Sequence, residues 1–408
     1  MGGERRRTMG ERRIDRRNFI KSTLLGVGGM LLSTPGLQQE VKAAEVKGKE
    51  RKFVYRVLGK TGLKIPVINM GVMLTDNPNL IRTALDSGIT LLDTAHGYMG
   101  GRNEEVIGSV IKGRARDSFY IASKVSLPQD RKTGLYTEGA TTKGFLTRLD
   151  TSLKRLGLDH IDILYQHGVS RKESVMYEPV LTAFEKAKKD GKIRFSGVST
   201  HSNEPEVIDA ATDSKMHEVV LTAYTFKQKH AESVRRAIAR ASQAGIGIVA
   251  MKAIRGGYQK PPSITNVTAS LKWILQDPNV TTVIAGFTTF EHIDVDLSVM
   301  EDLNLTEPEK LELQKEASIR GLYCQGCRQC VGQCPEELPI PDLMRAYMYA
   351  YGYGSLSYAR EVVSSLDLPA RVCNECSTCS VQCSMGFDIS RKVKHVARLQ
   401  GIGGGSDA

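Results

Sequence analysis

Short apolar runs alternate with amphipathic segments from about residue 53 to residue 318. The apolar runs begin near residues 68, 89, 119, 161, 193, 218, 247 and 281. Between them, apolar residues recur with helical spacing over 103–113, 142–157, 180–189, 233–245 and 263–277. The run 161–165 is apolar at nearly every position, as in a parallel strand buried on both faces. Eight strand–helix units in one domain predict an α/β fold, a closed (β/α)₈ TIM barrel rather than an open doubly wound sheet.

Two further patterns refine this prediction. No Gly-x-Gly-x-x-Gly motif follows the first strand, which argues against a Rossmann sheet. The segment 55–64, just before the first barrel strand, has the pattern of a β-hairpin. We expect this hairpin to cap the bottom of the barrel.

The net charge of +11 is concentrated near the N-terminus. Residues 1–52 hold 13 Lys and Arg against 6 Asp and Glu, which leaves 43 against 39 in the rest of the chain. A basic leader explains this excess better than a nucleic-acid-binding surface, so we expect no nucleic-acid partner.

The leader itself resembles a twin-arginine export signal. Arg16 and Arg17 stand in the segment 15–21, an apolar stretch follows over 22–37, and small residues offer cleavage after Ala43 or Ala44. A disordered basic tail and an uncleaved anchor are the alternatives. The resemblance implies the twin-arginine translocase as a partner, and a location in the periplasm or on the outer face of the cytoplasmic membrane.

Four ionisable or polar residues stand at or near the ends of consecutive predicted strands. Asp93 ends the second strand, Tyr98 follows in the next loop, Lys124 ends the third strand and His167 ends the fourth. Barrel enzymes carry their catalytic residues at the carboxyl ends of the strands. We therefore expect these four side chains to meet at one barrel mouth.

With these four residues in this order, and with the segments 92–95, 103–108 and 191–199, the middle domain resembles the aldo-keto reductases. The resemblance implies interconversion of a small carbonyl compound and an alcohol. Tyr98 would act as general acid and base, and the Lys124 ammonium would lower its pKa. Asp93 would hold Lys124, and His167 would donate a hydrogen bond to the carbonyl oxygen. His96, between Asp93 and Tyr98, is either a pocket residue or an incidental loop histidine.

The resemblance also implies a nicotinamide cofactor, NADP(H) or NAD(H). The positions expected to contact it are Ser199, Thr200, Met251, Gly286 and Thr288.

Several of these positions depart from the family pattern. Thr200 replaces the usual Asn, Leu221 a Gln and Met251 an aromatic residue, while Asp296 stands where an Asn usually faces adenine. The loop 286–292 offers no fixed cation for a 2′-phosphate. NADPH, NADH and a tightly held cofactor therefore all remain open.

All eight cysteines lie between residues 324 and 383, in two runs with the spacing C-x₂-C-x₂-C-x₃-C. This duplication resembles the two-cluster ferredoxins and implies two [4Fe–4S] clusters, each taking its fourth ligand from the other run. The first cluster would use Cys324, Cys327, Cys330 and Cys383. The second would use Cys373, Cys376, Cys379 and Cys334. Two structural zinc ions are the alternative, but zinc sites usually pair two C-x₂-C elements across a longer loop.

These patterns together predict five segments. They are a twin-arginine signal peptide (1–44), a linker (45–52), the barrel (53–318), a small, mainly α-helical ferredoxin-like domain (319–400) and a flexible tail (401–408). We expect an exported oxidoreductase that couples carbonyl chemistry to electron transfer with an unidentified redox partner. The alternatives are an enzyme whose clusters are structural, and an electron-carrier or binding protein whose barrel has lost catalysis.

Overall fold

The computed structural model describes residues 52–254, 266–318, 323–373, 376 and 378–401. The predicted signal peptide (1–44), the linker up to residue 51 and the tail after residue 401 lie outside these residues.

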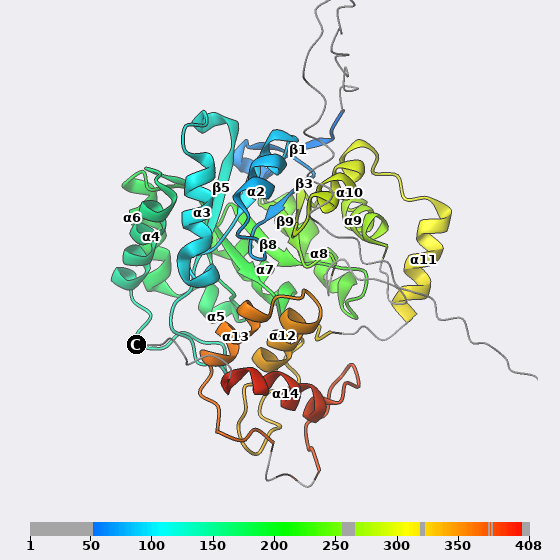
Figure 1. Cartoon of the computed structure of the whole chain (residues 1–408). Coiled ribbons are helices and arrows are strands. Elements are labelled where there is room, and N and C mark those ends of the chain that lie inside the picture. Colours follow the sequence, from blue (N-terminus) through cyan, green and yellow to red (C-terminus); the bar gives the residue numbers. More distant parts are fainter. Residues whose placement is uncertain (1–51, 255–265, 319–322, 374–375, 377, 402–408) are drawn as a thin grey trace, which may run out of the picture. The chain divides into compact units, whose positions relative to one another are not determined.

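A closed barrel of eight parallel strands forms the middle domain (Figure 1). The strands are β3 (Ile68–Gly71), β4 (Leu91–Asp93), β5 (Tyr120–Val125), β6 (Ile161–Gln166), β7 (Ile193–Thr200), β8 (Val219–Ala223), β9 (Gly247–Met251) and β10 (Thr282–Ala285). Each strand pairs with the next, and β10 pairs with β3 to close the circle. The predicted TIM barrel is confirmed, and every strand begins within two residues of the expected position.

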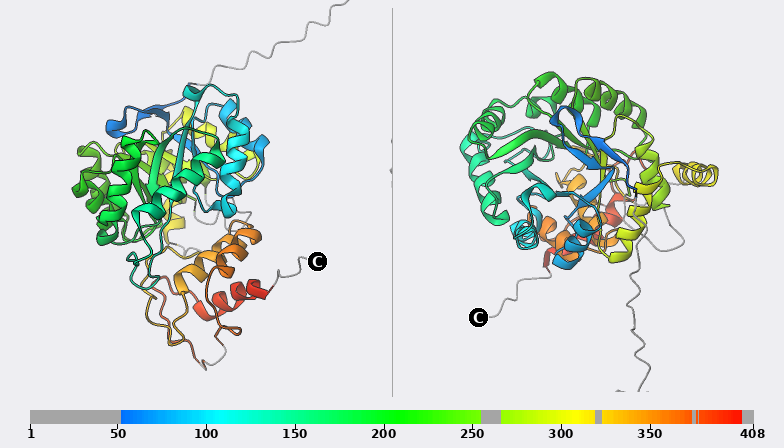
Figure 2. Two further views of the ribbon diagram at one scale, coloured as in Figure 1. Left: turned by 90° about the vertical axis from the view of Figure 1, so that its left-hand side faces the viewer. Right: turned by 90° about the horizontal axis from the view of Figure 1, so that it is seen from above.

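Helices surround the strands, as the view from above in Figure 2 shows. They are α2 (Pro78–Asp86), α3 (Arg102–Ile111), α4 (Thr142–Leu156), α5 (Lys172–Val175), α6 (Glu178–Lys189), α7 (Glu204–Ser214), α8 (Ala231–Gln243), α9 (Val267–Leu275) and α10 (Phe290–Glu301). Short 3₁₀ turns are η1 (Gly59–Thr61), η2 (Tyr98–Gly101) and η3 (Arg116–Ser118). The apolar face of each long helix packs on the barrel; α8, for example, buries Val234, Ala237, Ile238 and Ala241.

A hairpin closes the amino-terminal end of the barrel, as expected. Its strands are β1 (Tyr55–Val57) and β2 (Lys64–Pro66), which pair antiparallel. Leu58 and Ile65 are fully buried among side chains of the barrel interior. Gly247 permits this approach, because a Cβ there would lie 2.5 Å from the Leu58 side chain. The hairpin thus covers this end of the barrel, and the four expected site residues lie toward the carboxyl ends of the strands.

The cysteine-rich region forms a small helical module. Its helices are α12 (Ile340–Tyr351), α13 (Leu356–Ser364), α14 (Ile389–Ala397) and the 3₁₀ turn η4 (Arg398–Gly401). They share a core of their own that includes Leu343, Ala346, Val363 and Val393. The mainly α-helical character expected of this region is confirmed. Within the part of the chain that the structure describes, no helix is long and apolar enough to cross a bilayer.

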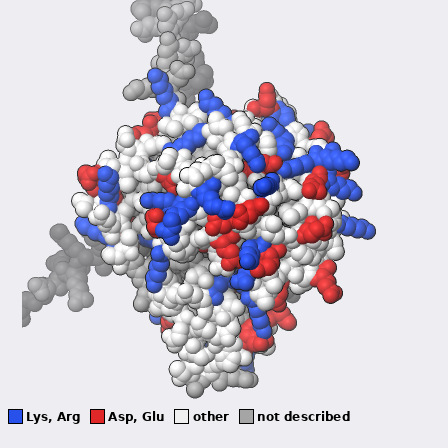
Figure 3. Space-filling model, turned by 180° about the vertical axis from the view of Figure 1, so that it is seen from behind, with Lys and Arg blue, Asp and Glu red and all other residues white. Residues whose placement is uncertain are grey.

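Charged side chains of both signs are interspersed over the barrel on the face drawn in Figure 3. No extended basic patch interrupts this mixture on that face, in keeping with the expected location of the excess charge in residues 1–52.

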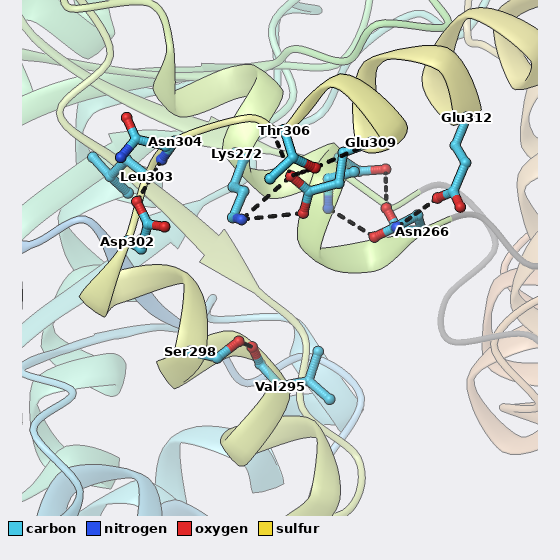
Figure 4. Close-up of polar contacts among 12 residues, drawn as sticks. Asn266, Lys272, Val295, Ser298, Asp302, Leu303, Asn304, Thr306, Glu309 and Glu312 are labelled. Carbon is cyan, nitrogen blue, oxygen red and sulfur yellow. Dashed lines mark hydrogen bonds and ion pairs between the residues drawn. The ribbon is translucent and has the colours of Figure 1, made fainter.

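The helix α11 (Glu307–Ser318) is held against α9 by polar contacts (Figure 4). Thr306 and Glu309 cap the start of α11 reciprocally, with Thr306 N–H donating to Glu309 Oε2 at 2.8 Å and Glu309 N–H to Thr306 Oγ1 at 3.3 Å. Glu309 also accepts from Lys272 Nζ at 3.1 Å, and Asn266 Nδ2 donates to Glu312 at 2.7 Å. This helix connects the barrel to the cysteine-rich module.

The replacement Glu309→Gln should lower the free energy of unfolding by about 1 kcal/mol, because it removes an ion pair and weakens the cap. The change can be measured by urea titration of the full chain, followed by the fluorescence of Trp273, the single tryptophan. Glu307→Gln is the control, since Glu307 is mostly exposed and pairs only with Lys310 one turn away. Equal effects of the two variants would show that the contact with α9 contributes nothing.

Candidate active site and cluster module

A buried ion pair forms the floor of the barrel mouth. Lys124 Nζ donates a hydrogen bond to Asp93 Oδ1, and a second one of 2.6 Å to the Thr94 carbonyl. The side chains of Lys124 and Asp93 are only 2% and 3% exposed. Burial lowers the pKa of Lys124 and raises that of Asp93, while their mutual attraction opposes both shifts. The neighbouring strands β4 and β5 bring the two groups together.

Tyr98 lies above this pair at the start of η2. The Lys124 ammonium is 5.0 Å from the centre of the Tyr98 ring. The chain turns sharply after Tyr98, with left-handed backbone at Met99 (φ 53°) and Gly100 (φ 62°). Asn103 secures the turn, since its side-chain amide donates to the Val72 carbonyl at 2.9 Å. The loop thus holds the phenol at the mouth.

The pKa of Tyr98 differs in direction from the sequence-based expectation. Burial, and then the charge of Asp93, raise it well above its ordinary value. Lys124 was expected to lower it, but that ammonium is already neutralised by Asp93. Arg345, from the cysteine-rich module, lowers the Tyr98 pKa by a smaller amount. In this structure the phenol therefore stays protonated at neutral pH.

His167 stands beside Tyr98, with the two ring centres 5.9 Å apart and the rings nearly perpendicular. Burial lowers the pKa of His167 to about 3, with further contributions from Lys124, Arg345 and Lys252. Its Nδ1 lies 2.9 Å from Ser126 Oγ. If the hydroxyl donates there, the neutral ring carries its proton on Nε2 and can donate it to a ligand.

His96 does not share this site. Its Nδ1 contacts Ser152 Oγ at 3.3 Å, and its carbonyl accepts from Arg155 at 2.8 Å. Of the two interpretations left open by the sequence, the geometry favours the incidental loop histidine.

Tyr98 lines two cavities at the mouth. The first, of about 160 Å³, is also lined by Asp93, Met251, Gly286 and Thr288. Three of the five expected nicotinamide positions therefore face one space beside Tyr98. This cavity is mainly apolar on the side of β9 and β10, which suits a flat aromatic ring.

Ser199 and Thr200 do not line that cavity. Both are fully buried. Ser199 Oγ accepts the Gly168 N–H at 2.9 Å, and the Thr200 hydroxyl donates to the Ser202 carbonyl at 2.8 Å. Their side chains serve the loops after β6 and β7. Leu221 is likewise buried in the barrel interior, and Asp296 is buried on α10.

The second cavity, of about 460 Å³, contains Tyr98 and His167 together. The cysteine-rich module supplies part of its wall. Tyr358 packs edge-on against Tyr98 at 6.5 Å between ring centres, and Tyr349 packs on Tyr358 at 4.8 Å. An ion pair of 2.7 Å joins Lys132 in the barrel to Glu337 in the module. The sequence carried no signal for the contacts of Tyr98 with Tyr358 and of Lys132 with Glu337, because each joins residues more than 200 positions apart.

The cysteines gather in two groups. Burial, followed by the thiols of Cys324, Cys327 and Cys383, raises the pKa of Cys330 to about 12. One group thus combines three cysteines of the first run with the last cysteine of the second run. This is the set expected for the first cluster.

The second group is complementary. Burial, then Glu336 and the thiols of Cys334 and Cys379, raises the pKa of Cys373 to about 11. Cys334 and Cys379 also neighbour Cys376. The structure therefore brings Cys334 of the first run to the remaining three cysteines of the second run.

This donor set fits an iron–sulfur cluster. The eight cysteines form no disulfide, and crowding disfavours thiolates in each group unless a positive core compensates. Among the described residues, no three or more His, Cys, Asp or Glu side chains are arranged to hold a single metal ion. A cubane differs, because each thiolate binds a separate iron.

Comparison with known proteins gives two family matches. Residues 72–261 match the aldo/keto reductase family, and residues 323–388 match the 4Fe-4S dicluster domain. The L-glyceraldehyde 3-phosphate reductase of Escherichia coli (strain K12) is 34% identical over 163 residues, which cover 37% of this chain and 46% of that protein. The chain thus spans about half the length of this relative.

Longer matches have lower identity. The uncharacterised oxidoreductase YqkF of Bacillus subtilis (strain 168) is 25% identical over 64% of this chain and 95% of its own. The holo form of an aldo-keto reductase from Bacillus halodurans superposes with a TM-score of 0.52 at 24% identity, over 67% of this chain and 98% of that one, and supports the fold. The chain therefore contains a domain of the aldo/keto reductase family, a family of oxidoreductases, followed by a 4Fe-4S dicluster domain.

Proposed function

We propose that the chain is an exported oxidoreductase that interconverts a small carbonyl compound and an alcohol. One observation carries the proposal: Tyr98 lies on the wall shared by two cavities, with Lys124 beneath it and His167 beside it. Such a position lets one phenol meet a substrate oxygen while a cofactor occupies the other cavity.

A bound nicotinamide would supply or accept a hydride, and Met251, Gly286 and Thr288 would hold it. In reduction, the Tyr98 hydroxyl gives its proton to the carbonyl oxygen, and neutral His167 donates a hydrogen bond to the same oxygen. Lys124, 5.0 Å from the ring, would offset only part of the charge of the phenolate left behind, because Asp93 already balances the ammonium and burial outweighs its effect. Asp93 keeps Lys124 charged and in place. In oxidation the same groups act in reverse.

We further propose that the clusters exchange electrons with the barrel and with a separate redox partner. Cys324 lines a small cavity of about 40 Å³ together with Lys252, which also lines both mouth cavities. The first cysteine group is therefore the one closer to the mouth. Alcohol oxidation would pass two electrons to the nicotinamide as a hydride. Their later transfer, one to each of two one-electron clusters, would restore the oxidised nicotinamide and release one proton.

Export by the twin-arginine route is proposed from the sequence motif at Arg16 and Arg17, which lies outside the described residues. It accords with the cluster module, because the route carries folded proteins and lets clusters be built in the reducing cytoplasm.

Replacing Tyr98 with Phe should reduce turnover about 10²- to 10⁴-fold while changing substrate binding little, because only the proton donor is removed. Small aldehydes and quinones are the first substrates to screen with NADH and NADPH. Tyr55→Phe, on the exposed hairpin, is the matched control. If Tyr98→Phe turns over a substrate as fast as the wild type, the barrel is not an enzyme of this type, and a scaffold or electron carrier is the better interpretation.

The pH profile should reflect the shifted groups. Reduction needs a protonated phenol, and the pKa of Tyr98 is raised, so kcat/KM for reduction should be flat from about pH 6 to about pH 8. With a pKa of about 3, His167 should produce no break near its ordinary value of about 6.5. Alcohol oxidation, which needs the phenolate, should rise toward alkaline pH. A break near pH 6.5 that disappears in His167→Gln would contradict this assignment.

Anaerobically purified protein should contain about eight irons and eight acid-labile sulfides per chain, as two cubanes require. Cys334→Ala should damage the cluster held by the second run, and Cys383→Ala the one held by the first run. Electron paramagnetic resonance of the reduced variants separates the two cases. Stoichiometric zinc without sulfide would rule out the clusters, and damage confined to the mutated run would refute the exchange of ligands.

A further inference from the structure

Positively charged side chains gather in the second cavity, at the end that faces the cysteine-rich module. Lys252 follows β9, whereas Arg328 and Arg345 belong to the module, and all three line the cavity that holds Tyr98 and His167. The same three cations line the small cavity beside Cys324, and no Asp or Glu does so among the described residues. Cations from the barrel and from the cysteine-rich module thus line the same two cavities.

The carboxylates of the larger cavity are engaged elsewhere. Asp342 pairs with Arg131 at 3.7 Å. Asp130 accepts hydrogen bonds from the Lys132 and Thr133 backbone at 3.0 and 2.6 Å. Neither forms a salt bridge with Arg345, although the charge of Asp342 acts to raise the pKa of Arg345. Four Lys and Arg side chains line this cavity against two Asp side chains, so an excess of positive charge remains.

Arg345 is the most informative of the three cations. It is partly buried on α12, and no hydrogen bond or salt bridge to its guanidinium is found within the described part of the chain. Arg328, in contrast, donates to the Arg131 carbonyl at 2.5 Å. A guanidinium does not deprotonate in a protein, so Arg345 faces the cavity as a permanent cation. Nearby groups, among them Tyr349 and Asp342, raise its pKa, but its N–H donors have no hydrogen-bonded partner among the described residues, and a bound anion would supply one.

The backbone supports a functional role for the other two cations. Lys252 and Arg328 both adopt left-handed backbone, with φ of 59° and 58°. Non-glycine residues adopt this conformation at a cost, and such residues gather at binding sites.

We propose that Arg345 and Lys252 bind an anionic group, a carboxylate or a phosphate, on the substrate. The proposal rests on the proposed function, because it places the anion in the cavity where Tyr98 and His167 would meet the carbonyl. Lys252 lines both cavities, but Arg345 lines only the second, so an anion held by both belongs to the substrate rather than to the nicotinamide cofactor. The fork of an arginine suits either oxyanion. The cluster module would then select the substrate as well as transfer electrons.

Cations beside Cys324 could instead serve only the negative charge of the cluster. Two observations favour the substrate. Arg345 and Lys252 both lower the pKa of His167, the ring that would contact the carbonyl. Lys252 belongs to the barrel, and it lines both the first cavity, proposed for the cofactor, and the second cavity, proposed for the substrate. A role confined to the cluster explains neither.

The test is equilibrium binding of malonate and of inorganic phosphate to the anaerobically purified, cluster-loaded full chain, by isothermal titration calorimetry. At least one probe should bind the wild type. Arg345→Met should weaken that binding roughly 10- to 100-fold, the range for a charged hydrogen bond, and Arg345→Lys should weaken it less. Lys252→Met, which leaves the cluster module untouched, should act in the same direction. Arg236→Met on the exposed face of α8 should bind as the wild type does.

Preference for malonate would identify a carboxylate substrate, and preference for phosphate a phosphorylated one. The proposal is overturned if neither probe binds the wild type, or if Arg345→Met binds as tightly while only the cluster reduction potential shifts. Iron content shows that each variant retains its clusters. Tyr98→Phe should bind the probe unchanged, so a failure of the catalytic assignment and a failure of the anion site give different results.

Discussion

The buried pair of Lys124 and Asp93 is the interaction on which the barrel mouth depends. Each charge alone would be costly so far from water, and removing one partner of such a pair typically costs about 3–5 kcal/mol. The pair is possible because β4 and β5 are adjacent, and Asp93, the last residue of β4, pairs with Ala122, two residues before Lys124 on β5. It places an ammonium 5.0 Å from the Tyr98 ring without leaving a net charge in the barrel core. Tyr98, His167 and the two cavities lie above this ion pair, in which the two charges balance each other.

The cluster module changes the electrostatics above that floor. By packing Tyr358 and Tyr349 at the mouth, it removes part of the water around Tyr98, which is 9% exposed, and around His167, which is half-buried. Exclusion of water disfavours both charged forms, so the phenol keeps its proton and the imidazole stays neutral. In such surroundings the positive charge of Arg345 also acts more strongly than it would in solvent. The module is therefore part of the site, and not a separate electron carrier attached to it.

Much of the fold followed from local patterns. The strands β3, β6, β7 and β9 begin where the apolar runs begin, because a strand buried on both faces has to be apolar throughout. The short helix α5 and the helix α13 were not predicted. The first has only four residues, too few to display a helical period, and the second lies in a connector where no period was recognised. Ser199 and Thr200 were placed by resemblance at the cofactor; in the structure they do not line the cavity beside Tyr98 but bond to the loops after β6 and β7, because strand position alone does not determine what a hydroxyl bonds to.

The sequence by itself determined the barrel, the four residues at its mouth and the two cysteine runs. Each is recognised from the spacing of residues along the chain, and this spacing does not depend on how the segments pack in the folded protein. Only the tertiary structure decided that Arg345 and Tyr358 reach Tyr98, that Lys252 borders both cavities, and that the pKa of Tyr98 is raised rather than lowered. The contacts depend on which side chains, distant in the sequence, line the same cavity. The pKa depends on how far the fold removes water from the phenol. Neither is encoded by a local sequence pattern.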